Sequence, residues 1–100
     1  MTIEATTWLY VAIQKNGPNE QIVGQTDTEH DISFIPAFLS KEVAQQAMFH
    51  LRLEKKKKYE VQAIICEDLA RHAVENGFLV WVLDEEGNVL ERLPSSGSGQ

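Results

Sequence analysis

One stretch limits what this chain can fold into more than any other, and it runs from Ser33 to Arg52, SFIPAFLSKEVAQQAMFHLR. Ser40 in its middle is a good helix N-cap, because its hydroxyl can accept a hydrogen bond from a free amide of the first turn. The residues after Ser40 repeat apolar side chains at the spacing of a core-facing helix. The residues before it are apolar and include Pro36, which favours a strand that ends there or lies at an edge. The stretch therefore predicts a strand followed by an amphipathic helix.

The part before this stretch predicts a β-hairpin. Thr6–Gln14 is a β-branched and aromatic run, and Gln21–Thr26 is a weaker run that could pair back on it. Between them lies Lys15–Glu20, KNGPNE, whose Asn, Gly and Pro residues are typical of a turn. The polar segment Asp27–Asp31 would then connect the hairpin to the strand before the helix.

The part after this stretch predicts a strand and a second helix. Basic residues suit the end of a helix, because its dipole favours cations there, so Lys55–Lys58 is expected to end the first helix. Tyr59–Ile64 alternates in polarity as a strand does. Glu67 and Asp68 would open a second helix, and Asn76-Gly77 is a helix stop.

The almost wholly apolar run Phe78–Asp84 predicts a strand central to the sheet. Val89–Leu93 would return beside it after a turn in which Gly87 is free to take a positive φ. The order is therefore β-β-β-α-β-α-β-β, and we expect an α/β (α+β) protein with a mixed β-sheet. If the strands are laid down in one direction, right-handed crossovers place both helices on one face and give two layers.

Length and composition fit one small domain. The chain has 100 residues, of which 43% are hydrophobic, and this is enough for one core. We expect residues 1–94 to form the domain and residues 95–100, SSGSGQ, to be a disordered tail. The single cysteine excludes an intrachain disulfide, and no run is long enough to span a bilayer. The start, MTIEATTW, has an early acid and is unlike a signal peptide, so we expect a cytoplasmic protein.

Three segments resemble the small α/β domain at the N-terminus of SseB-family proteins: FIPAFLSKEVAQQA, YEVQAIICEDLARHAVENG and FLVWVLDEEGNVL. In that family a strand ending in Pro-x-Phe with a Ser or Thr cap leads into a helix, and a second helix precedes a closing strand. The resemblance covers roughly residues 7–93 and implies the same fold. The closing segment departs from the family, which tends toward Asn-Pro where this chain has Asp84-Glu85. The family brings no established catalytic residues, so the resemblance implies no reaction.

The net charge of −6 is unevenly distributed. Four consecutive lysines, Lys55, Lys56, Lys57 and Lys58, are candidate anion-binding residues. The rest of the chain is acidic and disfavours non-specific nucleic-acid binding, and no recognition motif accompanies the lysines. A solvated helix end is the simpler interpretation. We therefore do not expect nucleic acid as a partner, and weak binding of nucleic acid or an anionic surface is kept as an alternative function.

The sequence offers few residues for catalysis. Cys66 lies where the second helix begins, and amide donors there could lower the pKa of its thiol. The simpler interpretation is a small buried hydrophobe. The acids and the histidine of Asp27–Asp31 match no calcium loop. We expect no enzyme, no metal and no cofactor, and a thiol-dependent enzyme or redox protein using Cys66 is the second alternative.

Aromatic side chains favour an interaction surface instead. If the helices cover the face of Leu9, Trp8 and Tyr10 lie on the opposite, open face, and Phe78–Leu83 adds large side chains to it, Trp81 among them. Exposed apolar patches of this kind usually mark an interface, and two-fold pairing would bury the patch. The expected function is a non-catalytic protein-interaction module that forms a homodimer through Trp8, Tyr10 and Trp81 and has an unknown protein partner. Pairing of strand edges is the competing route to a dimer.

Overall fold

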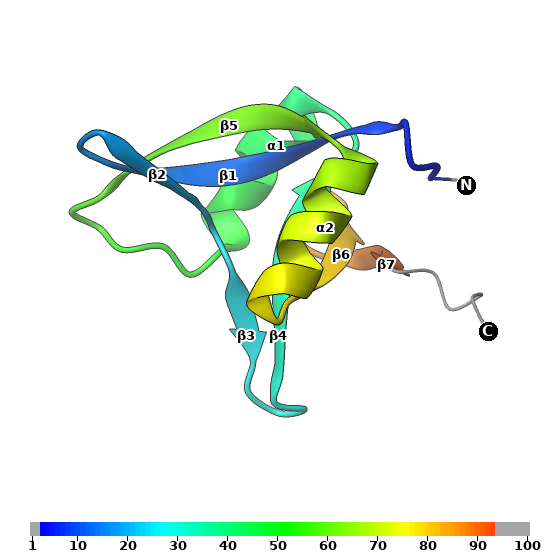
Figure 1. The fold of residues 1–100 in the computed structure, drawn as a ribbon. Coiled ribbons are helices and arrows are strands. Elements are labelled where there is room, and N and C mark those ends of the chain that lie inside the picture. Colours follow the sequence, from blue (N-terminus) through cyan, green and yellow to red (C-terminus); the bar gives the residue numbers. More distant parts are fainter. Residues whose placement is uncertain (1–2, 94–100) are drawn as a thin grey trace.

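The computed structural model describes residues 3–93. Seven strands form one mixed, open β-sheet, and two α-helices pack on it (Figure 1). The predicted α+β class is confirmed, whereas the predicted tail, residues 95–100, lies outside the described residues. The strands are β1 Trp8–Asn16, β2 Asn19–Ile22, β3 Gln25–Asp27, β4 Ile32–Phe38, β5 Lys58–Ile65, β6 Leu79–Leu83 and β7 Val89–Leu93. The helices are α1 Lys41–Ala47, the 3-10 turn η1 Met48–His50 and α2 Cys66–Asn76.

The sheet is built around β1, both edges of which are paired. β5 runs antiparallel along one edge, from Trp8 opposite Ile65 to Lys15 opposite Lys58 (Figure 1). On the other edge, the first part of β1 pairs with β4 and the last part pairs with β2. β6 follows β4 as a parallel neighbour, β7 follows β6 antiparallel, and β3 pairs with β4. The main order across the sheet is therefore β5-β1-β4-β6-β7.

The chain changes partner strands at Gly24, which separates β2 from β3. The sequence predicts one strand over Gln21–Thr26, and this is wrong, because the two short strands pair with β1 and β4 respectively. The amide of Val23 still donates to the carbonyl of Ala12 of β1, at 2.9 Å. A Cβ at Gly24 would lie only 2.6 Å from Cε1 of Phe78, a distance that real Cβ atoms do not adopt. Only glycine therefore fits this crossing as it stands.

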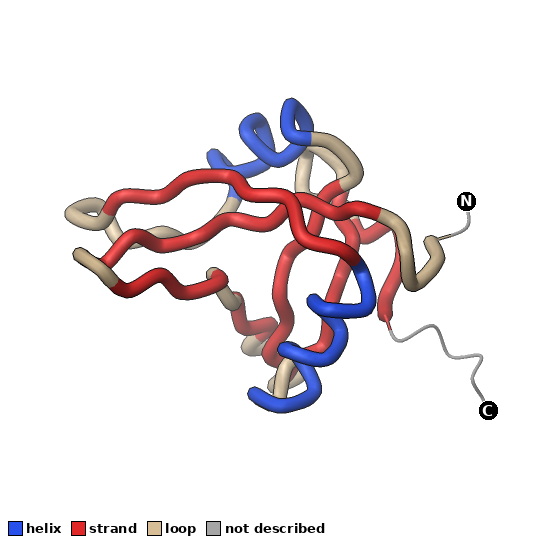
Figure 2. The backbone as a smooth tube through the Cα atoms, turned by 45° about the horizontal axis from the view of Figure 1, so that its top comes forward, coloured by secondary structure: helices blue, strands red, loops and turns tan. Residues whose placement is uncertain are grey.

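The two helices lie on opposite faces of the sheet (Figure 2), so the expectation that they share one face is wrong. α2 packs through Leu69 and Ala73, and α1 packs through Ala44 and Ala47. The buried strand residues on the α2 face are Leu9, Val11, Ile13, Ile35, Ala37, Val80, Val82 and Leu93. The α1 face holds Phe38, Trp81 and Leu83, with Tyr10, Phe34 and Val61 packed at their margin.

The direction of the two crossovers explains this arrangement. β4 and β5 are both antiparallel to β1, and β6 is parallel to β4, so β4, β5 and β6 share one direction. Through α1 the chain passes β1 to reach β5, and through α2 it returns past β1 and β4 to reach β6. Crossovers of one hand that travel in opposite directions place their helices on opposite faces. The one-face expectation assumed that the chain lays its strands down in one direction only.

The predicted signals at the ends of the helices are confirmed at two positions. Ser40 is the N-cap of α1, and its Oγ accepts a hydrogen bond from the amide of Val43 at 3.1 Å. Gly77 ends α2 with φ 78°, a left-handed conformation that glycine adopts at little cost. Local chemistry therefore sets where α1 begins and where α2 ends.

The first helix is shorter than predicted. α1 ends at Ala47 and passes into η1, after which Leu51 has an extended backbone, with φ −88° and ψ 153°. Lys55–Lys58, predicted to end the helix, lie instead in the following loop and at the first position of β5. Phe49 lies in η1 after the end of α1 and is 88% exposed.

Candidate functional site

The three predicted interface residues lie in different environments. Trp81 is only 7% exposed and belongs to the core cluster on the α1 face of the sheet. Its ring stacks on Phe34 with the centroids 4.3 Å apart, and Cζ of Arg92 lies 5.1 Å from its ring centroid. Tyr10 is half-buried against the same core, while Trp8 at the start of β1 is 57% exposed. The face expected to be open is therefore covered, and of the three residues Trp8 has the most accessible side chain.

Cys66 is a buried residue at the start of α2. Its amide donates to the carbonyl of Thr7 at 2.8 Å, so the beginning of the helix continues the ladder between β5 and the chain before β1. Burial, together with the charges of Glu91 and Glu67, raises the pKa of the Cys66 thiol. Because the thiolate is the reactive form, this environment disfavours nucleophilic or redox chemistry at Cys66.

The acidic loop between β3 and β4 forms a polar turn. Oδ1 of Asp27 accepts hydrogen bonds from the amides of Glu29, at 3.1 Å, and His30, at 3.3 Å. Oδ2 of Asp27 lies 3.0 Å from Nδ1 of His30, and this contact lowers the pKa of Asp27. Within residues 3–93, no group of three His, Cys, Asp or Glu side chains is placed to hold a metal ion.

A cavity of about 790 Å³ lies on the α2 face, between the β1–β2–β5 part of the sheet and the C-terminal half of α2. Its apolar lining includes Ile22, Ile64 and Phe78, and polar side chains from several elements stand around them. Asn76 is one of these, but its Nδ2 already donates to the carbonyl of His72 at 2.8 Å. The cavity has room for a ligand, and its side chains do not point to one ligand chemistry.

The outer edge of β5 is the longest open strand edge in the described part of the sheet. Cys66 bonds to Thr7 at the end of the β1–β5 ladder, and antiparallel pairing alternates inward and outward backbone groups from there. The groups that point toward β1 belong to Lys58, Glu60, Gln62 and Ile64. The amides and carbonyls that point away from β1 belong to Tyr59, Val61, Ala63 and Ile65, and no other strand of residues 3–93 pairs with them. We call these four the edge-facing residues.

A groove of about 680 Å³, here called the edge groove, lies between β5 and the outer side of α1 and η1. It is lined by Lys41, Gln45, Met48, Phe49, Leu53, Tyr59, Glu60 and Val61. The hydroxyl of Tyr59 accepts a hydrogen bond from the amide of Glu54 at 2.8 Å, which fixes the loop that leads into β5. Side chains alternate between the two faces of a strand, so every second side chain of a strand added at β5 would point to the α1 face, where this groove lies.

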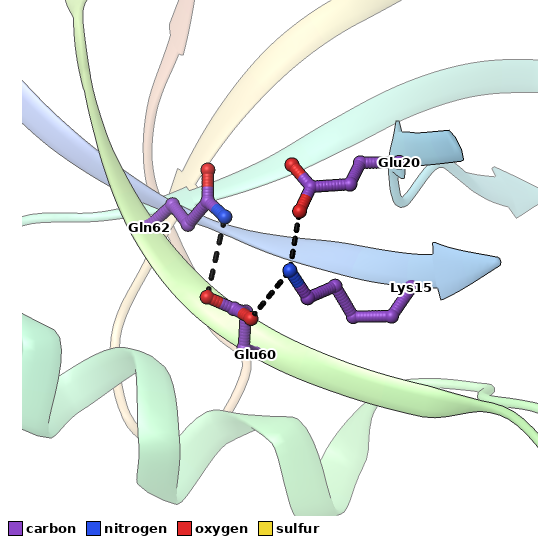
Figure 3. Close-up of polar contacts among 4 residues, drawn as sticks. All are labelled: Lys15, Glu20, Glu60 and Gln62. Carbon is purple, nitrogen blue, oxygen red and sulfur yellow. Dashed lines mark hydrogen bonds and ion pairs between the residues drawn. The ribbon is translucent and has the colours of Figure 1, made fainter. Parts of the chain in front are cut away.

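On the other face, polar contacts connect β5 to its neighbours (Figure 3). Nζ of Lys15 on β1 contacts the carboxylate of Glu20 on β2 and lies 3.0 Å from Oε1 of Glu60 on β5. Gln62 donates from Nε2 to Oε2 of Glu60 at 3.2 Å. The hydrogen bond from Lys15 is the main reason that the pKa of Glu60 is lowered. These contacts orient the side chains of Glu60 and Gln62 in the middle of β5.

Charges of opposite sign lie near the two ends of β5. Lys55–Lys58 at its beginning are exposed, and within residues 3–93 none of them forms an ion pair. Glu67 and Asp68 follow its end, in the first turn of α2, and both are exposed. Asp68 lies 3.3 Å from Nη1 of Arg71 on the same helix, an exposed pair that is worth little. The strand thus has a basic end and an acidic end, which sequence reasoning did not connect with an edge.

No family model matches the chain, and no match was found among curated proteins or solved structures. The resemblance to the SseB-family domain therefore stays a prediction. Among residues 3–93, neither helix has the length and apolar character needed to cross a membrane.

Proposed function

We propose that this chain is a non-catalytic protein-interaction module that binds an extended polypeptide segment along the outer edge of β5. The observation that carries the proposal is the row of edge-facing backbone groups on an eight-residue strand. A segment added there gains main-chain hydrogen bonds, and pockets for its alternate side chains provide specificity. The edge groove, with the exposed Phe49 in its wall, would provide such a pocket.

The sequence of β5 supports this use of the edge. Native sheets usually protect an edge by charged side chains, above all lysine, or by a proline, a bulge, a very short strand or a covering segment. β5 has neither proline nor glycine, its register against β1 is regular from Lys58 to Ile65, and its two charged residues, Lys58 and Glu60, lie in its first half. Residues 61–65 carry no charge and no break, and an edge of this kind is a template for another strand.

Ala63 offers a direct test, because its side chain is exposed and its amide points away from β1. Ala63→Pro removes this one donor, and proline is tolerated where a strand N–H faces solvent. Peptides selected from a random display library on sparsely immobilised protein should bind the wild type and the matched control Ala63→Val. They should lose at least about fivefold in affinity for Ala63→Pro, the loss of a single backbone hydrogen bond. Equal binding to Ala63→Pro, with an unchanged circular dichroism spectrum, would contradict the proposal.

The exposed lysines favour one second candidate function, the binding of nucleic acid or another anionic surface. Lys55–Lys58 are exposed and form no ion pair within the described chain. Binding of this kind weakens steeply with salt, because it releases counterions. Titration of a labelled single-stranded oligonucleotide at two salt concentrations tests it, with replacement of the four lysines by Gln as the control. If the affinity for the oligonucleotide is unchanged by this replacement, the lysines are not its binding site.

A further inference from the structure

We infer that the segment bound at the edge of β5 is β5 of a second copy of this chain, antiparallel and centred on Gln62. The inference rests on the proposed function, because it needs the same open edge. A two-fold axis perpendicular to a sheet places residues of one face opposite residues of the same face. The axis must therefore pass through a residue of β5 opposite its own copy, and few such residues lie near the middle of the strand.

Gln62 is the centre that uses every edge-facing group. With Gln62 opposite Gln62, Tyr59 lies opposite Ile65 of the second copy, and Val61 lies opposite its Ala63. The symmetry repeats both pairs, so all four edge-facing residues exchange backbone hydrogen bonds. An axis at Val61 would leave Ile65 opposite a loop residue, and an axis at Ala63 would leave Tyr59 opposite the first turn of α2.

The same register brings unlike charges together at both ends of the paired strands. The register brings the loop that holds Lys56 and Lys57 next to the first turn of α2 of the second copy, which holds Glu67 and Asp68. The basic end of each strand thus meets the acidic end of the other, and symmetry repeats the contact. Arrangements of this kind favour one register and orientation over others.

Exposed aromatic side chains approach each other in this arrangement. Trp8 is the neighbour of Ile65 on β1, and Ile65 would pair with Tyr59 of the other copy. Trp8 of each copy would therefore stand two strands, about 10 Å, from the other copy's Tyr59, which lines the edge groove together with Phe49. Trp8 and Phe49 are 57% and 88% exposed in the single chain, and aromatic residues are enriched at interface centres.

Sedimentation equilibrium of the whole chain tests the occupant. The wild type and Ala63→Val should be dimeric, and Ala63→Pro should dissociate at least about 30-fold more readily, because symmetry removes two hydrogen bonds per dimer. Circular dichroism checks that Ala63→Pro is folded. A monomeric wild type overturns the inference and leaves the strand-addition proposal to the peptide-binding test. A dimer that Ala63→Pro does not weaken overturns both.

Cross-linking tests the register, in a Cys66→Ser background that removes the native thiol. In the Gln62-centred dimer the two Gln62 form a non-hydrogen-bonded pair with Cα atoms about 4.5 Å apart, within reach of a disulfide. Gln62→Cys should therefore form a disulfide-linked dimer on mild oxidation. The matched control Lys58→Cys, on the same face of the strand, should not, because its two copies would lie far apart. Cross-linking of Lys58→Cys without Gln62→Cys overturns the register.

Charge exchange tests the contact between the strand ends. Lys57→Glu and Glu67→Lys should each weaken dimerisation by at least about fivefold at low salt, because each creates two repulsive contacts per dimer. An equal mixture of the two variants should regain the wild-type affinity, since the heterodimer restores attraction at both ends. A mixture no tighter than either variant alone, with a wild-type dimer established, would overturn the Gln62-centred register.

Discussion

The two outer edges of the main sheet, β7 and β5, are built in different ways. β7 is a five-residue strand whose register against β6 shifts between Val82 and Leu83, and Pro94 follows it in the sequence. β5 has eight residues in regular register and the edge groove beside its open edge. Short, irregular edges resist further pairing, whereas long, regular edges invite it. The comparison teaches that β7 ends the sheet, while β5 leaves it open to continue.

The largest expected effect comes from a proline in the strand beside the protected edge. Val82 of β6 lies between Ala37 of β4 and Glu91 of β7, so both of its edges are paired. Val82→Pro removes a ladder hydrogen bond and adds a clash, and it should cost about 3 kcal/mol or more and abolish cooperative unfolding. Ala63→Pro in β5 should keep a cooperative thermal transition. If Val82→Pro and Ala63→Pro lose the same free energy of unfolding, the outer side of β5 is not the open edge described here.

A loss of stability that leaves unfolding cooperative should follow truncation of the aromatic cluster formed by Trp81, Phe34 and Arg92. Trp81→Ala removes the stack on Phe34 and the contact with Arg92, and it should cost about 3–5 kcal/mol in urea unfolding. Trp81→Phe keeps an aromatic ring, and it removes a buried Nε1 that has no hydrogen-bond partner in the described structure. This control should therefore cost clearly less, about 1 kcal/mol. Equal losses would mean that ring size, not stacking, decides the stability of this cluster.

The turn that joins β6 to β7 should make stability depend on pH. Oδ1 of Asp84 accepts hydrogen bonds from the amides of Glu86, at 2.9 Å, and Asn88, at 2.8 Å. The backbone bond from Asn88 is the main reason that the pKa of Asp84 is lowered. A lowered folded pKa gives stability that is present above the unfolded pKa, about 3.9 for Asp, and is lost as the pH falls through the folded value.

Asp84→Asn should therefore be less stable than the wild type at neutral pH, and the difference should shrink as the pH falls below about 4. Urea unfolding of both proteins between neutral and acidic pH measures it. A difference that stays constant over this range would show that the charge of Asp84 does not contribute.

The smallest effect on stability is expected from the lysines beside β5. Replacement of Lys55–Lys58 by Gln should change the free energy of unfolding by no more than about 1 kcal/mol, since these side chains are exposed and unpaired in the described chain. The same change should weaken self-association at low salt. A loss of stability several times larger would show that the lysines are partners of the acidic part of the fold.

Local chemistry could be predicted from the sequence, and the arrangement of the sheet could not. Ser40, Gly77 and the turn at Gly87 act through hydrogen bonds and φ values within a few residues, and all three are confirmed. The end of α1 was missed, because the apolar residues after Ala47 continue a helical spacing although the chain turns and extends there. Pairing partners are set by contacts between distant residues, which the spacing of side chains does not encode.

The candidate site shows the same division. The lysine run was recognised, and the sequence placed Glu67 and Asp68 at the opening of a helix. The open edge of β5 could not be recognised, since it depends on β1 having β2 and β4 on its other side. Trp81 was predicted to be exposed because both helices were expected on the other face. One signal was available in the sequence: Tyr59–Ile65 contains no proline and no glycine, and so has none of the breaks that often protect an edge strand.

The position of β1 in the centre of the sheet also has a consequence for how quickly the chain folds. β1 is synthesised before the other strands of the sheet, yet one of its edges has no partner until β5 is made. In the same way, one edge of β4 has no partner until β6 is made. Pairing Trp8 with Ile65 closes a long loop, and the entropy of that closure is lost before the strands gain their hydrogen bonds. We therefore expect folding in milliseconds to seconds, and not in microseconds. A nascent chain that ends before β5 would expose β1 to wrong partners.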